Sequence, residues 1–476
     1  MGITINKKSI FTGLLILLAG NIQAFNNVKL NASVSGSMYY TDNVNLDYTN
    51  EKSNLVGRIS PSIGLSTKGS RVRTQVNYTM SGLTYNKDSG NDDIYHNLSS
   101  SANAEIVKQS IFLDGFANVR QVLLDQNKNA SSDLVSGSNN TTETYTYGLT
   151  PSWKKKWGNY ASSVLSYGYN EVKFSGGGNS DSTGQNVNLT VSSGTKFNQY
   201  FWDLNSRYSE TSYQSSGSSL NARDTTSEAS YVTLGYHYSR RLDLRVRLGY
   251  EDYDRTVSDG FGWTVGGNWR PSQRTSLDAS WGERAFGRTA SLDFNHRSKR
   301  LTWQVNYSDS ITNSRGQIIQ DSQAINNANL NPGNVANVNV PLSTYDANLR
   351  LTRRLTGSSS YRFSKSTITL GGFAEAIYYK DEDKKDNLNQ GLNLSWNINV
   401  SGRSSLTSRV SWTQLDDRQN QTNNKQNRKD FSLSFTRSLN PELSGSINYT
   451  YRTNSADLRT SEYTENRISA TLTKSF

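Results

Sequence analysis

Apolar and polar residues alternate along most of this chain. Between Val28 and Met38, apolar or small residues occupy the even positions and polar residues occupy the odd ones. Residues 71–80, 242–251 and 301–308 repeat this alternation. The side chains of a β-strand point to its two faces in turn. Each segment therefore predicts a strand with one apolar and one polar face.

The alternating segments are long. They run for about a dozen residues, whereas strands in soluble proteins have about 5–6. A tilted strand needs about 9–11 residues to cross the hydrocarbon core of a membrane. The pattern predicts an all-β protein, a transmembrane, antiparallel, up-and-down β-barrel in the outer membrane of a Gram-negative bacterium.

Short and long connections alternate between the predicted strands. Tight turns are predicted at Thr67–Ser70, Lys155–Gly158, Thr195–Asn198, Ser239–Arg241, Pro271–Gln273, Arg297–Lys299, Phe363–Ser366, Ser401–Arg403 and Leu439–Pro441. Longer polar connections are predicted at Thr41–Ser53, Asp125–Thr142, Ser175–Thr183, Gln214–Thr225, Asn313–Ser343 and Asp416–Arg428. Outer-membrane barrels have short periplasmic turns and long outer loops. The alternation predicts about 22 strands, within a range of roughly 18–24, and places both ends in the periplasm.

The composition agrees with a barrel and narrows the alternatives. Hydrophobic residues make up 34% of the chain and the mean hydropathy is −0.70, too little for a large soluble core. Aromatic residues reach 11%, which argues against disorder because disordered chains are poor in them. The absence of cysteine excludes disulfides and thiolate metal sites. The net charge of +11 is scattered along the chain, so no nucleic-acid partner is predicted.

Residues 1–24 have the pattern of a signal peptide. Two lysines precede the short apolar run Ile10–Ala19, and Ala24 offers a small residue before the expected cleavage point. No later apolar run reaches the ~18 residues that a transmembrane helix needs. We therefore expect residues 25–476 to form the outer-membrane β-barrel.

The width of the predicted barrel raises the question of what fills it. Transporter barrels of this size are plugged. Because the first predicted strand begins soon after the cleavage point, we expect no N-terminal plug domain. The lumen is then either open or filled by outer loops, and Asn313–Ser343 is the candidate for folding inward.

The C-terminal segment places Ile468, Ala470, Leu472 and the terminal Phe476 on one face. A terminal Phe behind alternating apolar residues resembles the signal read by the barrel assembly machinery. Lys474 departs from that pattern, in which an aromatic or apolar residue is more usual. We predict that Phe476 is a barrel-insertion signal, with the barrel assembly machinery and outer-membrane lipid as partners.

Aromatic residues near the predicted strand ends are interpreted as interfacial girdles, although any that point inward could stack on sugars. They are Tyr39, Tyr40, Tyr85, Trp153, Trp157, Tyr250, Trp263, Trp269 and Trp281. Pro61 and Pro151 fall inside predicted strands, where proline cannot donate to the ladder. We expect β-bulges near the periplasmic rim to accommodate both.

The polar faces of the strands carry the candidates for contact with a solute. An Arg or Lys on the lipid face would cost ~2–4 kcal/mol at the midplane, so charged strand residues are assigned to the lumen. The lumen-facing candidates are Arg58, Arg71, Arg73, Arg120, Arg207, Asp243, Arg245 and Arg247, and Asp114, Asp203, Asp278 and Asp293 are assigned to the same side. An excess of Arg favours anionic solutes. Charges of both signs could equally close the lumen with salt bridges.

No enzyme activity, cofactor or metal site is predicted. The histidines are His96, His237 and His296, and none has a partner at metal-ligand spacing. The sequence contains no catalytic constellation and no phosphate-binding glycine loop. Basic clusters at 154–156, 240–241, 299–300 and 353–354 lie at or near predicted short turns. They are interpreted as a solvated periplasmic rim, with contact to anionic headgroups or a periplasmic partner as the alternative.

Five segments together resemble a known family. They are Tyr40–Val44, Lys52–Leu65, Gly69–Tyr85, Phe112–Gln121 and Tyr361–Tyr379. Across most of the mature chain, and in this order, they resemble the outer-membrane β-barrel proteins associated with exosortase/PEP-CTERM systems. That family occurs alongside exopolysaccharide production and export, and it has no assigned catalytic residues.

The resemblance implies a pore that takes part in exopolysaccharide secretion across the outer membrane. Polysaccharide and periplasmic export proteins would then be partners. Two alternatives stay open on the residues alone. One is a general diffusion porin for small solutes, and the other is a closed surface-binding or structural barrel.

Overall fold

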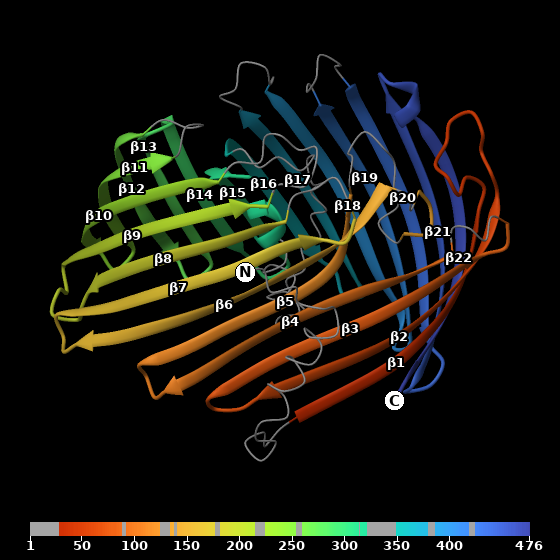
Figure 1. Cartoon of the computed structure of the whole chain (residues 1–476), viewed down its shortest axis with the longest axis horizontal. Helices are drawn as coiled ribbons and strands as arrows, with labels where there is room; N and C mark the ends of the chain where they lie inside the picture. The colour runs from red at the N-terminus through yellow and green to blue at the C-terminus, as the bar shows by residue number, and fades with distance from the viewer. Residues whose placement is uncertain are drawn as a thin grey trace.

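The computed structural model of the chain is a closed antiparallel barrel of 22 strands (Figure 1). The structure describes residues 28–87, 92–123, 134–137, 140–176, 181–214, 224–253, 259–313, 315–320, 349–378, 386–417 and 424–476. The expected signal peptide, residues 1–24, lies outside the described residues. No helix among the described residues is long and apolar enough to cross a membrane.

Each strand pairs with the next one along the chain. The strands are β1 (Val28–Thr41), β2 (Asn54–Lys68), β3 (Val72–Tyr85), β4 (Asp93–Val107), β5 (Ile111–Leu123), β6 (Thr141–Trp157), β7 (Ala161–Phe174), β8 (Ser182–Ser193), β9 (Tyr200–Tyr213), β10 (Thr225–Ser239), β11 (Leu242–Tyr253), β12 (Gly260–Ser272), β13 (Thr275–Arg284), β14 (Gly287–Arg297), β15 (Leu301–Thr312), β16 (Arg350–Arg362), β17 (Ser366–Tyr378), β18 (Asn387–Ser401), β19 (Ser404–Asp417), β20 (Asn424–Ser438), β21 (Leu443–Ala456) and β22 (Tyr463–Ser475). β1 also pairs with β22, from Ser33 opposite Ser475 to Thr41 opposite Arg467, and this closes the barrel. The predicted barrel and its strand number are confirmed.

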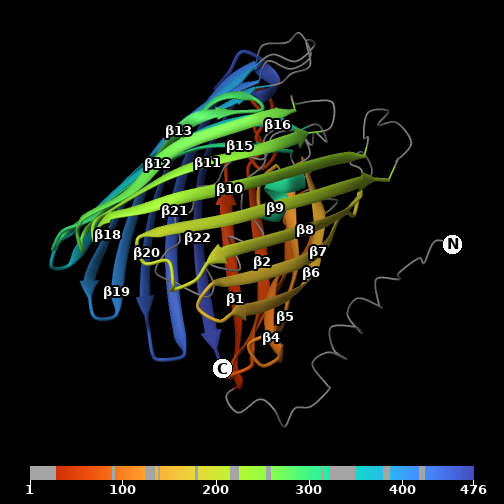
Figure 2. The same ribbon diagram turned by 90° about the vertical axis from the view of Figure 1, so that its left-hand side faces the viewer.

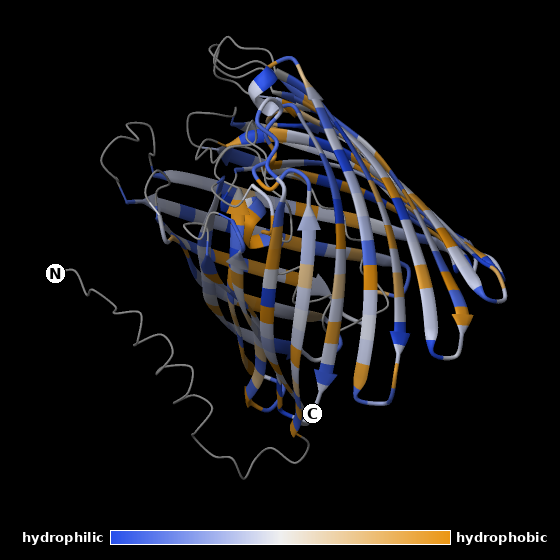
Figure 3. Ribbon diagram, turned by 90° about the vertical axis from the view of Figure 1, so that its right-hand side faces the viewer, coloured by the Kyte–Doolittle hydropathy of each residue, from blue (hydrophilic) through white to orange (hydrophobic). Residues whose placement is uncertain are grey.

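The outward faces of the strands are apolar. Leu244, Val246 and Leu248 of β11 are all exposed. Val246 stands opposite the exposed Leu234 of β10 and Val265 of β12, and residues opposite each other share a face. Figure 3 shows apolar and polar bands alternating along the strands. An apolar outer wall of this kind is what a barrel in a membrane needs.

The short turns gather at one end of the barrel, which we take as the periplasmic end. All nine predicted tight turns fall between consecutive strands there. β1 begins and β22 ends at the same end, as the C-terminal mark in Figures 1 and 2 shows for β22. At the outer end one connection is also short, because only Ala285 and Phe286 separate β13 from β14.

The expected bulges at the two strand prolines are wrong. Pro61 stands opposite Val34 of β1, and the register between β2 and β3 continues unshifted on both sides of it. The same holds for Pro151 between β6 and its two neighbours. A missing N–H removes a single ladder bond, which a long ladder tolerates without an inserted residue. Register shifts occur instead where strands enter periplasmic turns, such as between His237 and Ser239.

Two interpretations from the sequence need correction. Tyr85 is not part of a girdle, because it lies on the inward face of β3 and is buried. Tyr39 packs against the same inner cluster. Arg353 and Arg354 are not at a periplasmic turn, because β16 begins at Arg350 and they lie near its outer end. The exposed Trp residues of the predicted girdle are outward, at 153, 157, 269 and 281.

Candidate functional site

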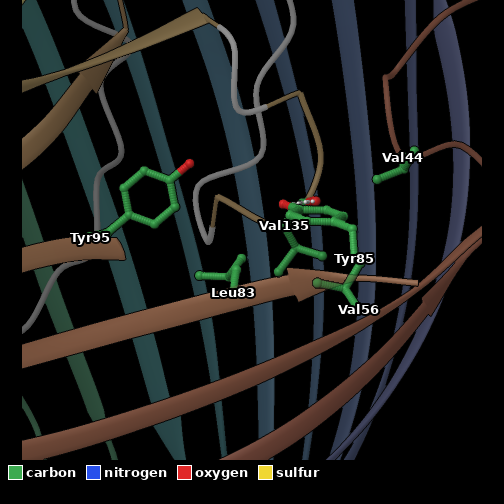
Figure 4. Close-up of a cluster of buried hydrophobic side chains, with 6 residues drawn as sticks. All are labelled: Val44, Val56, Leu83, Tyr85, Tyr95 and Val135. Atoms are coloured by element: carbon green, nitrogen blue, oxygen red, sulfur yellow. Dashed lines mark hydrogen bonds between the residues drawn. The ribbon is translucent and has the colours of Figure 1, made fainter. Parts of the chain in front are cut away.

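A short segment between β5 and β6 folds into the outer mouth of the barrel. In this first inward segment, residues 134–137, Val135 is 0% exposed. It packs with inward side chains of β2, β3 and β4 and with Val44 from the β1–β2 connection (Figure 4). These residues, Val44, Val56, Leu83, Tyr85, Tyr95 and Val135, form a hydrophobic core inside the lumen. Burial of this apolar surface holds the segment inward.

Polar contacts fix the same segment at three points. The backbone N–H of Gly137 donates to the carbonyl of Val44 at 2.9 Å. The hydroxyl of Tyr85 donates to the carbonyl of Val135 at 3.1 Å. The hydroxyl of Ser136 donates to Oε1 of Glu465 in β22 at 2.6 Å. The segment therefore reaches from β5 across β1–β4 to the strand that closes the barrel.

Glu465 is the charged centre of this anchor. Its carboxylate is fully buried, and it accepts a hydrogen bond from Thr41 Oγ1 at 2.9 Å. Arg452 lies 3.3 Å away and Arg467 lies 3.8 Å away. A buried carboxylate is tolerated only with such partners, because burial of an unpaired charge is costly. The first inward segment therefore binds to a carboxylate whose negative charge is already balanced by two arginines.

A second segment crosses the lumen from β15. Residues 315–320 form a short helix, which lies inside the ring of strands in Figures 1 and 2. Arg315 donates from Nε to Ser182 Oγ of β8 at 2.9 Å and also donates to the carbonyl of Asn170 in β7 at 3.1 Å. Asn313 donates to the hydroxyl of Tyr213 in β9 at 2.9 Å. None of these strands is a neighbour of β15, so the segment spans the lumen.

We call Asn313 together with residues 315–320 the second inward segment. Two further arginines bind it, and one glycine leaves space for it. Arg120 of β5 donates to the carbonyl of Ile318 at 3.3 Å, and Arg350 donates to Gln317 at 2.8 Å. A Cβ at Gly184 would lie 2.6 Å from the Arg315 guanidinium, so glycine makes room for it. The predicted inward segment Asn313–Ser343 therefore begins inside the barrel. Its residues 314 and 321–343 lie outside the described residues.

The two inward segments divide the inner wall into two parts. They contact β22, β1–β5 and β7–β9, and we call the inward faces of β22 and β1–β9 the covered wall. In the described part of the chain, neither segment hydrogen-bonds to β10–β14. We call the inward faces of these five strands the bare wall.

The bare wall carries a ladder of charges along β11. Asp243, near the periplasmic end, bonds to His237 at 2.6 Å and to Arg270 at 2.5 Å. Arg245 pairs with Asp278 of β13, with one N–O distance of 2.7 Å. The distances are those of charge-assisted hydrogen bonds.

The outer part of the same ladder is different. Glu251 accepts a hydrogen bond from Nε of Arg284 in β13 at 2.8 Å. Arg247, between these pairs, has no carboxylate partner among the described residues. Its guanidinium instead lies 3.5 Å from the ring centroid of Tyr231 in β10.

The other lumen-facing candidates are spread over several heights of the wall. Arg58 donates to the hydroxyls of Ser60 and Ser81. Arg71 is exposed in the β2–β3 turn, at the rim and outside the wall of strands, and Arg73 is exposed at the periplasmic end of β3. Arg207 is exposed on β9, opposite Ala229 and Asn188. The structure does not bring these arginines together into one cluster.

The three histidines bind different partners on different strands. His96 bonds to the hydroxyl of Tyr78 at 2.8 Å, His237 to Asp243, and His296 to Thr275 at 2.9 Å. At the C-terminus, the backbone N–H of Phe476 donates to the carbonyl of Ala32 at 2.9 Å. Lys474, which departs from the expected pattern, forms an ion pair with Glu442 in the β20–β21 turn.

Sequence reasoning missed the residues that build the outer mouth. Ser136, Glu465 and Arg315 were not among the candidates, and neither was Tyr231 of the bare wall. One signal was present for the inward segments, because each contains an adjacent apolar pair within a connection that is rich in polar residues. The pairs are Leu134–Val135 and Ile318–Ile319.

No protein-family model matches the chain, and no curated protein is similar to it in sequence. Solved structures are similar in fold. A variant of the ferric enterobactin receptor from Pseudomonas aeruginosa has a TM-score of 0.53 at 11% identity, over 94% of this chain and 80% of that one. The FrpB iron transporter from Neisseria meningitidis has a TM-score of 0.52 at 11% identity, over 94% and 82%.

A siderophore receptor from Acinetobacter baumannii is similar to the same degree, with a TM-score of 0.52 at 9% identity over 95% of this chain and 81% of that one. The likeness shows the fold. The chain is a 22-strand outer-membrane β-barrel of the shape found in these receptors and transporters. The comparisons give no support to the exosortase-associated family, and they leave the substrate open.

Proposed function

We propose that this chain is an outer-membrane conduit for hydrophilic, acidic solutes, with exopolysaccharide as the secreted substrate, and that the two inward segments gate its outer mouth. The observation that carries the gate is the anchoring of both segments on the inner wall. One is held by Glu465 and the inner hydrophobic core, and the other by Ser182, Tyr213 and Arg120.

The polar inner wall supports passage of a hydrated solute. Inward positions of β8, for example, are Ser182, Gly184, Asn186, Asn188 and Thr190, which offer hydrogen bonds and no apolar surface. Arginines on several strands add positive charge, which raises the local concentration of anions. Passage itself would be passive, and energy for secretion would come from inner-membrane machinery.

The choice of exopolysaccharide is supported by the resemblance of segments such as Lys52–Leu65 and Tyr361–Tyr379 to exopolysaccharide-linked barrels. A general porin for small solutes would use the same wall. A closed surface-binding barrel is favoured by one specific observation, the burial of Val135 and Glu465 in the anchor. Conductance separates the closed barrel from the two kinds of pore.

The test of the gate is single-channel recording in planar bilayers. Residues 315–347 can be replaced by a short Gly-Ser linker, because Thr312 and Arg350 at the ends of the loop are paired neighbours. We expect the replaced barrel, and more weakly Ser136→Ala, to conduct more than the wild type. Arg300→Ala, in the periplasmic β14–β15 turn, is the matched control and leaves conductance unchanged. Silence in every form would contradict a conduit and leave the closed barrel.

The substrate needs a cellular test. Deletion of the gene is expected to abolish or strongly reduce secreted exopolysaccharide, while intracellular or periplasmic polymer accumulates. Complementation with the wild-type gene restores secretion. Unchanged secretion in a clean deletion would remove exopolysaccharide as the substrate and leave the general porin.

A further inference from the structure

Along β11, one charged residue breaks the pattern of its neighbours. Asp243, Arg245 and Glu251 each bond to an opposite charge on an adjacent or nearby strand. Arg247 faces the lumen between them, and its partners across β10 and β12 are Thr233 and Thr264. On the same row of the wall, the carboxylate of Asp203 is two strands away. A guanidinium in a partly desolvated wall is expected to have a counter-charge.

The ring of Tyr231 forms the base of this position. Tyr231 stands opposite Gly249, and a Cβ there would lie 2.3 Å from the ring, so the ring lies flat across the glycine. The Arg247 guanidinium carbon lies over the ring, 3.5 Å from its centroid. Stacking of this kind holds the plane of a guanidinium and leaves its N–H groups free to donate.

Two observations indicate unfilled binding capacity here. Tyr231 is 7% exposed, and its hydroxyl has no hydrogen-bond partner among the described residues. Arg247 has like charges near it, Arg245 and Arg284, whose own carboxylate partners are already bound. The inward positions 262 and 266 of β12, on either side of Thr264, are glycine, so Thr264 is the one inward side chain that this strand places next to the site.

We propose that Arg247 and Tyr231 form a binding subsite for an anionic group of the solute, a carboxylate above all. An Arg fork binds a carboxylate with two parallel hydrogen bonds. A uronic acid in an acidic glycan carries such a carboxylate, and a small inorganic anion offers the same chemistry. The inference rests on the proposed conduit for the identity of its substrate, but the binding itself can be measured without conductance.

The probe is trigalacturonate, with maltotriose as the neutral control and inorganic sulfate as the small anion. Binding to the detergent-solubilised full-length barrel is measured by calorimetry, and block of the ion current is measured in bilayers. We expect Arg247→Gln to weaken trigalacturonate binding about tenfold or more, because a charge-assisted hydrogen bond pair is lost. Maltotriose binding stays weak in both proteins.

Two variants separate a site from a general charge effect. Arg207→Gln removes an exposed inward arginine of β9 that lies over no aromatic ring of the described residues. We expect it to leave trigalacturonate binding within about twofold of wild type. Tyr231→Leu keeps Arg247 but removes its base, and we expect an intermediate loss. Heat-modifiable migration on gels confirms that each variant is folded.

Equal losses in Arg247→Gln and Arg207→Gln would overturn the subsite, since lumen charge alone would explain them. Unchanged trigalacturonate binding in Arg247→Gln would also overturn the subsite. If the wild type conducts in that case, the proposed conduit is still supported. Binding that depends on Arg247 in a barrel that never conducts would keep the subsite and remove the conduit. Arg247-dependent binding of sulfate but not of trigalacturonate would keep the anionic subsite and assign it to small anions.

Discussion

The covered wall and the bare wall use charge in different ways. On the covered wall, Glu465 is fully buried, with Arg452 only 15% exposed beside it. On the bare wall, Arg245 and Asp278 are 28% and 33% exposed. The first pair anchors the first inward segment, residues 134–137, and the second is partly exposed on the inner wall. Burial, more than distance, therefore decides what each pair contributes.

The bare wall also depends on glycines at positions that face the lumen. Tyr231 lies over Gly249, and Phe201 lies over Gly235, where a Cβ would come within 2.0 Å of the ring. These inward rings lie along the wall and do not project into the lumen. The glycines thus let the aromatic rings lie along the wall, so that the rings take up less of the space inside the barrel.

The largest predicted effect is at the partners of Glu465, the buried carboxylate of the covered wall. Arg452→Leu, in the adjacent strand β21, removes the nearer of the two arginines beside the buried Glu465, at 3.3 Å, and leaves Arg467 at 3.8 Å. Removal of one partner of a buried pair costs about 3–5 kcal/mol. Arg245→Leu on the bare wall should cost about 0.2–1 kcal/mol, because its pair is partly solvated. Urea titration in lipid vesicles, followed by tryptophan fluorescence, measures both. Equal losses of unfolding free energy in the two variants would contradict the proposed difference between the buried and the partly exposed ion pairs.

A smaller effect is expected from Gly249→Ala on the bare wall. The new Cβ would lie 2.3 Å from both the Tyr231 ring and the carbonyl oxygen of Ser230. Overpacking of this kind costs about 1–3 kcal/mol. Gly82→Ala is the matched control, since no atom lies within 4 Å of its added Cβ. The same urea titration applies, and a loss in the control as large as in the variant would contradict the packing argument.

The smallest effect is at the periplasmic rim, away from both walls. The hydrogen bond from Lys474 lowers the pKa of Glu442 below its usual 4.5. The stabilisation is therefore present above that value and is lost as the pH falls through the lower, folded-state pKa. Glu442→Gln should lower the melting temperature slightly at about pH 7, and the difference should shrink as the pH is lowered through the folded-state pKa. A difference that does not change with pH would show that the ion pair contributes nothing.

The strands and turns could be predicted from the sequence because both depend on local patterns. Alternation assigns the faces of β11, and turn residues such as Pro271 and Pro441 mark the periplasmic ends. The site could not be predicted in the same way. The role of Ser136 depends on Glu465, more than three hundred positions away in the chain, and alternation cannot show which loop folds back.

Alternation correctly placed Arg247 on the lumen face of β11, but it could not show that this arginine lacks a carboxylate partner among the described residues. Its lack of a counter-charge depends on which residues stand opposite on β10 and β12. Tyr85 shows the reverse problem, because a ring near a strand end resembles a girdle residue until its face is known. Register between strands, which a single sequence does not reveal, is the missing information for Arg247, whereas continued alternation along β3 already places position 85 on the polar face.

The glycine–aromatic pairs have a consequence for assembly of the barrel. Four inward rings stand directly opposite a glycine on the next strand: Phe116 opposite Gly148, Phe201 opposite Gly235, Tyr231 opposite Gly249, and Phe373 opposite Gly391. A slip of one residue would turn the ring to the other face of the sheet. A slip of two would place Tyr231 against Arg247 or Glu251, whose side chains would occupy the space of the ring. In each pair the ring therefore meets a glycine in the observed alignment, and a slip of one or two residues brings it to the other face or opposite a residue with a side chain.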